Sequence, residues 1–180
     1  MSGGVAWALV GLGLGVVAVR RRSAAIALVT AQSALLGVGA FALTPRRSTE
    51  FLLASAALVA KAVLLAVLLG WSLARTREKL PVRDETPPIL RFGLAVAIAL
   101  GVTALVPAFG LEDRSSEQAT VTLVAIGIAT VVLRRATLFQ VLGLLVAENG
   151  IALAATAVEG GMPLVIELGA LFDVIVVALV

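Results

Sequence analysis

The sequence predicts an all-α fold, a polytopic transmembrane helix bundle with about seven spans. Three observations lead to this fold class. Of the 180 residues, 61% are hydrophobic and only 14% are charged, whereas a soluble domain is roughly half apolar and a quarter charged. The mean hydropathy is +1.11. The charged residues are clustered, and the apolar stretches between clusters approach the roughly 20 residues that a hydrocarbon core about 30 Å thick requires.

The predicted spans are the apolar runs between these clusters, at residues 3–19, 23–43, 51–73, 92–110, 118–133, 137–158 and 163–180. The first run is followed by Arg20-Arg21-Arg22, whereas a signal peptide carries its charges before the apolar segment, so we expect a retained helix. The run at 118–133 is the shortest of the seven. An odd number of spans places the two termini on opposite sides of the membrane.

Basic residues are divided unequally between the alternate loops. One side carries Arg20, Arg21, Arg22, Arg75, Arg77, Lys79, Arg83, Arg91, Arg134 and Arg135. The other side carries Arg46, Arg47 and Arg114. By the positive-inside rule we expect the N-terminus outside and the C-terminus inside the cytoplasmic membrane. The net charge of +3 then reflects membrane orientation and not binding to nucleic acid.

The chain divides into three predicted parts. Residues 1–73 form an N-terminal three-helix group, residues 74–91 a cytoplasmic loop, and residues 92–180 a C-terminal four-helix group. The loop carries Pro81, Pro87 and Pro88 among mixed charges, a composition typical of a surface connection.

The composition excludes several kinds of chemistry. The chain has neither cysteine nor histidine, which removes the usual ligands of zinc, haem and iron–sulfur clusters as well as the Ser/His/Asp and Cys/His catalytic arrangements. The glycine-rich run GLGLGVV after Val10 follows no strand and is wholly apolar, so we expect helix packing there and not nucleotide binding. We therefore predict no metal, no cofactor and a non-catalytic role.

Four charged residues lie within the predicted spans: Lys61 in the third, Glu148 in the sixth, and Glu167 and Asp173 in the seventh. A lone charge at such a depth costs several kcal/mol, so each needs a partner or a proton. The favoured interpretation is proton transfer, in which a change in the charge of a neighbouring group causes one of these residues to take up or release a proton. The alternative for Lys61 is a buried ion pair that only fixes the register of two helices.

Glu148 is the acid that we most expect to transfer protons, with Lys61 and Asp173 as relay neighbours. It is followed by Asn149 and Gly150, an amide and a small residue beside which water or a second helix could approach. The alternative is a protonated Glu148 that is hydrogen-bonded to a neighbouring helix and never titrates.

Two further sets of polar residues carry weaker expectations. Glu167 and Asp173 are six residues apart and face directions roughly 120° apart on a helix, so they cannot form one two-carboxylate site. For Glu167, relay and helix contact both remain open. Gln32, with Ser33, is expected to make interhelical hydrogen bonds, and Gln32 and Asn149 are the predicted supporting polar residues.

The C-terminal quarter reads QVLGLLVAENGIALAATAVEGGMPLVIELGALFDVIVVALV. Its combination of Glu148-Asn149-Gly150 with Pro163, Glu167-Leu168-Gly169 and Phe172-Asp173 resembles the component E family of hydrogenase-4 and formate hydrogenlyase-type membrane complexes. The resemblance is strongest over residues 137–180, and Lys61 also fits the family.

The last three helices of that family are similar to the 4L/K subunit of complex I and the C subunit of Mrp-type cation/proton antiporters, whose acids in adjacent helices belong to a lateral proton path. The resemblance puts Leu145 where complex I has a glutamate, with Glu148 about one turn later and Asp173 near the second glutamate. The chain thus departs from that pattern by one helical turn.

The resemblance implies a membrane-arm subunit of a complex I-related respiratory complex or a group 4 nickel–iron hydrogenase complex. Its partners would be antiporter-like membrane subunits and a peripheral redox module. The alternatives are a subunit of an Mrp-type antiporter, a stand-alone ion-coupled secondary transporter, and a structural anchor whose buried charges only set helix register.

Overall fold

The computed structural model describes residues 3–43, 49–75, 87–108, 110–111, 113–158 and Gly169. Within these residues the secondary structure is helical, without strands. The helices are α1 (Gly3–Ala18), α2 (Arg22–Leu43), α3 (Thr49–Arg75), α4 (Pro88–Leu105), α5 (Arg114–Leu133) and α6 (Thr137–Ala157). The predicted all-α fold class is therefore confirmed for the described part of the chain.

Four of these helices, α2, α4, α5 and α6, are long and apolar enough to cross a membrane. Helix α1 and the apolar part of α3, Ser55–Trp71, are shorter. Each of the six helices coincides with one predicted span. The seventh predicted span, residues 163–180, lies outside the described residues except for Gly169, which is helical.

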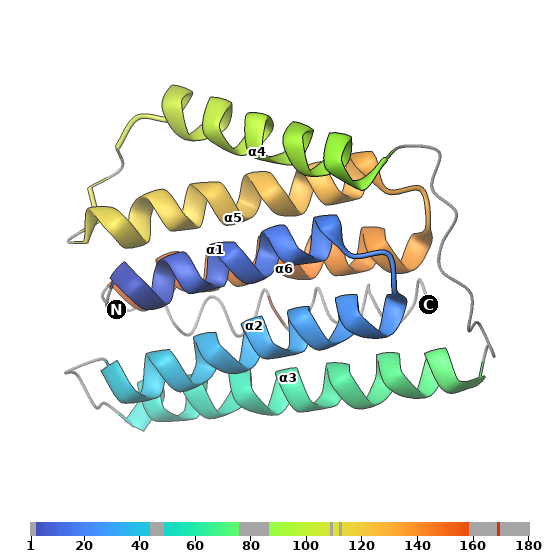
Figure 1. Cartoon of the computed structure of the whole chain (residues 1–180). Coiled ribbons are helices and arrows are strands. Elements are labelled where there is room, and N and C mark those ends of the chain that lie inside the picture. The colour runs from blue at the N-terminus through green and yellow to red at the C-terminus, as the bar shows by residue number, and fades with distance from the viewer. Residues whose placement is uncertain are drawn as a thin grey trace.

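The helices pack side by side as one bundle (Figure 1). Helices α1, α5 and α6 form its middle, α4 covers one flank, and α2 followed by α3 forms the other. Among the described helices, α1 contacts α2, α4, α5 and α6, whereas α3 contacts α2 only. The predicted N-terminal and C-terminal groups are thus joined through α1. The fully buried core includes Leu9, Leu36, Leu123, Leu142 and Leu153.

Helices α5 and α6 approach each other at glycines. A Cβ atom on Gly127 would lie 2.6 Å from the carbonyl oxygen of Gly143, and a Cβ atom on Gly143 would lie 2.8 Å from that of Gly127. Both distances are too short for any side chain, so this crossing requires glycine in both helices. Close approach through small residues is how helices associate in a bilayer, where the hydrophobic effect does not draw them together.

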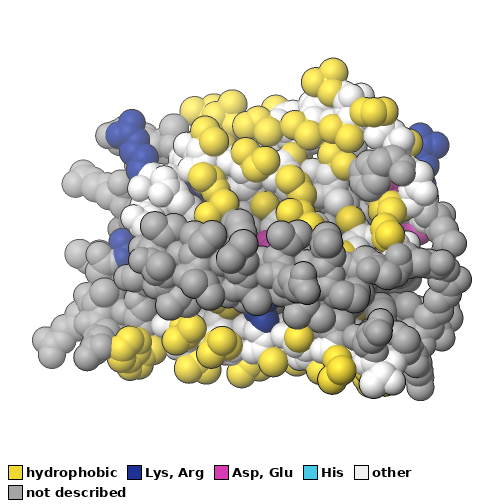
Figure 2. Space-filling model, turned by 180° about the vertical axis from the view of Figure 1, so that it is seen from behind, with side chains coloured by type: hydrophobic (Ala, Val, Ile, Leu, Met, Phe, Trp, Pro, Cys, Tyr) yellow, Lys and Arg dark blue, Asp and Glu magenta, His cyan; other side chains and the backbone are white. Residues whose placement is uncertain are grey.

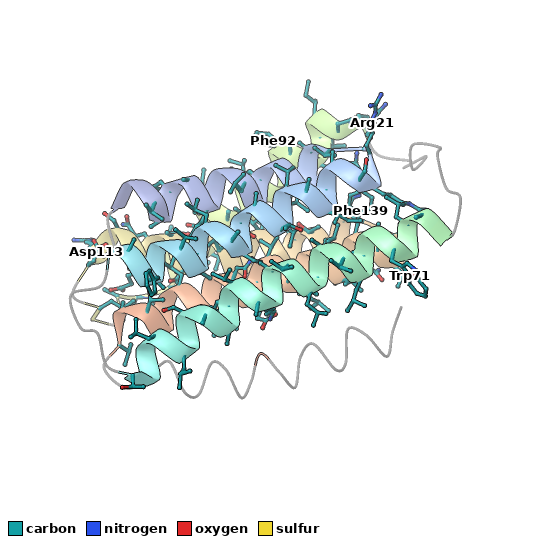
Figure 3. The ribbon with its side chains drawn as sticks, turned by 90° about the horizontal axis from the view of Figure 1, so that it is seen from below. Arg21, Trp71, Phe92, Asp113 and Phe139 are labelled. Carbon is teal, nitrogen blue, oxygen red and sulfur yellow. The ribbon has the colours of Figure 1, made fainter. Side chains whose placement is uncertain are left out.

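The two ends of the bundle are marked by side-chain contacts. Arg134, which follows α5, donates from Nη1 to the carbonyl oxygens of Val17 and Val19 at 3.3 and 3.0 Å. At the other end, Gly3 lies against Ser115. Helices α1 and α5 are therefore parallel. Figure 3 shows Arg21 and Phe139 at the end opposite Asp113.

Helix α4 begins and ends earlier than the predicted span 92–110. Pro88 occupies its first turn, where proline's fixed φ suits a helix and its missing N–H costs nothing. At the other end Val106 is extended, with φ −79° and ψ 118°, because it precedes Pro107, which disfavours helical geometry in the residue before it. The connection between α3 and α4 is consequently shorter than the predicted loop at 74–91.

Helix α5 begins at Arg114, before the predicted start at residue 118, because Asp113 caps it. The Asp113 carboxylate accepts hydrogen bonds from the Ser115 N–H at 3.0 Å and from the Ser116 hydroxyl at 2.7 Å. These bonds satisfy groups that the first helical turn leaves without partners.

Two arginines that we assigned to surface loops are buried. Arg91 lies inside α4 and Arg134 caps α5, and both side chains are 0% exposed. The guanidinium of Arg134 faces the carbonyl end of α1, where the helix dipole favours a cation, and its Cζ lies 3.3 Å from the centroid of the Phe139 ring. Arg134 is therefore part of the packing as well as of the charge asymmetry.

Candidate ion-pair site in the centre of the bundle

Lys61 and Glu148 form an ion pair, called here the central ion pair. The ammonium group of Lys61 donates a hydrogen bond to Oε1 of Glu148. Both residues lie near the middle of their helices, α3 and α6. Their side chains are 14% and 12% exposed. The structure thus brings together the first two residues of the predicted proton-transfer set.

The central ion pair joins helices that do not otherwise pack together. Among the described residues, the backbones of α3 and α6 make no close contact, and each packs against α2. The long side chain of Lys61 crosses this gap. Because α3 contacts α2 only, the pair is a direct side-chain connection from α3 to the centre of the bundle.

A buried amide cluster lies beside the central ion pair. It consists of Gln32, Ser33 and Asn149, each at most 5% exposed. Nδ2 of Asn149 lies 3.0 Å from both Oε1 of Gln32 and Oγ of Ser33, and the Ser33 hydroxyl donates to Oδ1 of Asn149 at 3.2 Å. Nε2 of Gln32 donates to the carbonyl oxygen of Leu9 at 2.8 Å. The cluster links α1, α2 and α6, which confirms the predicted interhelical hydrogen bonding.

A glycine in α1 makes room for this cluster. A Cβ atom on Gly13 would lie 3.2 Å from Nε2 of Gln32, so a larger residue would press on the amide that reaches Leu9. A Cβ atom on Gly15 would lie similarly close to Leu28, whereas a Cβ atom on Gly11 would meet nothing within 4 Å. The predicted packing role of GLGLGVV is confirmed at Gly13 and Gly15 and wrong at Gly11, which faces outward.

The two groups of side chains can do different chemistry. A carboxylate and an amine can each bind and release a proton, whereas the amides of Gln32 and Asn149 donate and accept hydrogen bonds without changing charge. The central ion pair is therefore the part of the site that can hold a mobile proton, and the amide cluster fixes the helix that carries Glu148. Among the described residues, no group of three acids, cysteines or histidines could hold a metal ion.

The remaining predicted residues have other positions. Glu167 and Asp173 lie outside the described residues. Leu145 is buried in the apolar core, 1% exposed. Our sequence interpretation gave Gly169 no role at the site, although it lies against the central ion pair. The sequence around Gly169 gave no signal for this contact, because a glycine in an apolar run is typical of helix packing in general.

Comparison with known proteins gives one relative. No protein-family model matches the chain, and no solved structure matches it. The chain is similar to the uncharacterized protein Rv0085 of Mycobacterium tuberculosis, with 31% identity over 131 residues, which cover 68% of this chain and 60% of that protein. The chain thus spans less than two thirds of the length of this relative.

Proposed function

We propose that this chain is a non-catalytic membrane-arm subunit of a complex I-related respiratory or group 4 nickel–iron hydrogenase complex. In this proposal it carries protons through buried charged residues while partner subunits perform the redox chemistry. The chain crosses the membrane about seven times, with its N-terminus outside and its C-terminus inside the cytoplasmic membrane. The resemblance over residues 137–180 supports the identity of the complex.

The observation that carries the proposal is the central ion pair. Placing a charged residue such as Lys at the centre of a bilayer costs about 2.5–3.5 kcal/mol by insertion scales. A structural contact between two helices is available more cheaply from small apolar residues. Both side chains are largely buried, 14% exposed for Lys61 and 12% for Glu148, so the two charges lie mainly within the bundle.

The surroundings of the pair also favour proton transfer. Asn149 is fixed by hydrogen bonds to Gln32 and Ser33, which holds α6 while leaving the carboxylate of Glu148 directed toward α3. A proton moving from Lys61 to Glu148 neutralises both groups, so little net charge has to cross the low-dielectric interior. Glu167 and Asp173 are the proposed further members of the relay.

The variant that tests this role is Glu148→Gln, which keeps shape and hydrogen bonding but cannot carry the proton. In the assembled complex we expect redox turnover with an artificial acceptor to continue while proton pumping is lost. The matched control is Glu117→Gln, the same change at a buried acid near the start of α5, which is expected to leave pumping intact.

Assembly of each variant complex is checked first by native gel electrophoresis. If the Glu148→Gln complex assembles and pumps the wild-type number of protons per electron, Glu148 is structural. If the wild-type chain is recovered from gently solubilised membranes only as a monomer or homodimer, the complex-subunit proposal fails. Ion transport by the purified chain in liposomes would then favour the secondary transporter.

A further inference from the structure

Gly169 lies against the central ion pair. This residue is buried and helical. A Cβ atom on it would lie 2.9 Å from Oε1 of Glu148 and 3.7 Å from Nζ of Lys61. The carboxylate oxygen concerned is the one that accepts the hydrogen bond from Lys61. The backbone at residue 169 therefore covers the point where the two charged groups meet.

This contact differs from those of the other described glycines. At Gly127 and Gly143 a Cβ atom would meet backbone atoms of the facing helix, and at Gly93 and Gly101 it would meet open space. Among the described glycines, Gly169 alone places its missing side chain against charged atoms. A methyl group there would press on a flexible carboxylate and not on rigid backbone, so its effect would fall on the central ion pair itself.

From this geometry we propose that Gly169 is a positioning residue, whose lack of a side chain lets the Glu148 carboxylate lie within hydrogen-bonding distance of Lys61. The backbone at Gly169 then covers the central ion pair without pushing the two side chains apart. The inference rests on the central ion pair that the proposed function uses, but it concerns the geometry of the pair and not the movement of protons.

The test is a double-mutant cycle on the purified full-length chain in detergent, followed by thermal unfolding. Gly169→Ala is expected to lower the Tm by about 2–4 °C, whereas Gly101→Ala, the matched control on the open face of α4, should leave it unchanged or raise it slightly. In a Glu148→Ala background the carboxylate is gone, so Gly169→Ala should lower the Tm by less than half as much as in the wild type. An equal fall in both backgrounds, or none in the wild type, would overturn the proposal.

A spectroscopic measurement separates positioning from general packing. The infrared carboxylate band of Glu148, identified by subtracting the spectrum of Glu148→Gln, should shift in Gly169→Ala and stay unchanged in Gly101→Ala. An unshifted band in Gly169→Ala contradicts the proposal. If Glu148→Ala does not fold because Lys61 loses the carboxylate that it bonds, Lys61→Met/Glu148→Ala provides the background instead. Thermal unfolding and infrared spectroscopy do not depend on proton pumping. The inference about Gly169 can therefore fail while the proposed function holds, and the reverse.

Discussion

At the scale of single residues, the amide cluster satisfies its buried polar groups by hydrogen bonds between helices. Asn149 and Gln32 bond each other, and Gln32 also reaches the Leu9 carbonyl. Buried polar groups are expensive when they lose a partner and nearly neutral when both partners become apolar. The amide cluster should therefore respond to single and paired substitutions in very different ways.

We expect Asn149→Leu to destabilise the chain by about 1–3 kcal/mol, because it leaves Gln32 Oε1 and the Ser33 hydroxyl buried without their partner. Adding Gln32→Leu should restore part of that loss, since the amide left without a partner is then also removed. Unfolding in increasing denaturing detergent gives the free energies of the two single variants and the double variant. Losses that simply add would mean that the two amides are not energetically coupled.

Asp113 predicts a pH dependence at one end of the bundle. The hydrogen bond from the Ser116 hydroxyl lowers the pKa of Asp113 below its ordinary value of 3.8, and the Ser115 N–H contributes in the same direction, while burial opposes both. A carboxyl group with a lowered pKa in the folded state stabilises the fold above its unfolded pKa and loses that contribution as the pH falls through its folded pKa.

The comparison is with Asp113→Asn, which can also cap a helix but does not titrate in this range. The difference in Tm between wild type and Asp113→Asn should be present at pH 6 and shrink below about pH 4. The size of this effect is small, because the side chain is partly exposed. Ser116→Ala, which removes the largest cause of the shift, should move the pH dependence upward toward the ordinary value; no movement would count against this assignment.

At the scale of helices, the contact between α5 and α6 depends on glycine. A Cβ atom on Gly127 would lie 2.6 Å from the Gly143 carbonyl oxygen and 2.6 Å from the Ala147 backbone nitrogen. Neither atom can move without moving α6. Helix α4, in contrast, turns Gly93 and Gly101 toward open space. Figure 2 shows hydrophobic side chains of the described residues along the upper and lower parts of the visible face, as expected of a lipid-facing surface.

We expect Gly127→Ala to destabilise the bundle by about 1–3 kcal/mol, because overpacking at this contact forces the two backbones apart. Gly101→Ala is the matched control and should be neutral or slightly stabilising, since alanine favours helix more than glycine does. Both are measured by unfolding in denaturing detergent. Equal stabilities of the two variants would show that α5 and α6 are not held in close contact at Gly127.

At the scale of the whole molecule, the helices alternate in direction, and most of the described basic residues therefore lie at one end of the bundle. The contacts of Arg134 with Val17 and Val19 place the end of α5 beside the end of α1. The clusters Arg20–Arg22 and Arg134–Arg135 therefore lie at one end of the bundle, and Arg114 at the other. Exposed Trp7 and Trp71 lie near opposite ends, as expected of residues in the two membrane interfaces.

Labelling of single cysteines in this cysteine-free chain tests the orientation. Ser23 and Ala108 are both exposed and lie at opposite ends of the bundle. With the N-terminus outside, Ala108→Cys should react with an impermeant thiol reagent added to intact cells, whereas Ser23→Cys should react only after the membrane is permeabilised. Reaction of Ser23→Cys alone in intact cells would reverse the orientation.

The sequence by itself determined the helices and the residues that needed partners. Apolar runs of membrane length located the described helices to within a few residues, because length and hydropathy act locally along the chain. The cost of a buried charge singled out Lys61 and Glu148. Errors at helix ends came from proline and capping geometry, as at Pro88, Pro107 and Asp113, where one residue decides the boundary.

Only the tertiary structure decided which residues meet. The pairing of Lys61 with Glu148 joins positions 87 residues apart, and the contact of Gly169 with that pair depends on a third segment of the chain. The burial of Arg134 could not be predicted either, because its partners are carbonyl oxygens at the end of α1, which carry no signature in the sequence. A hydropathy pattern gives the environment of each helix, but pairing depends on how the helices are arranged around one another, and many arrangements of apolar helices satisfy the same pattern.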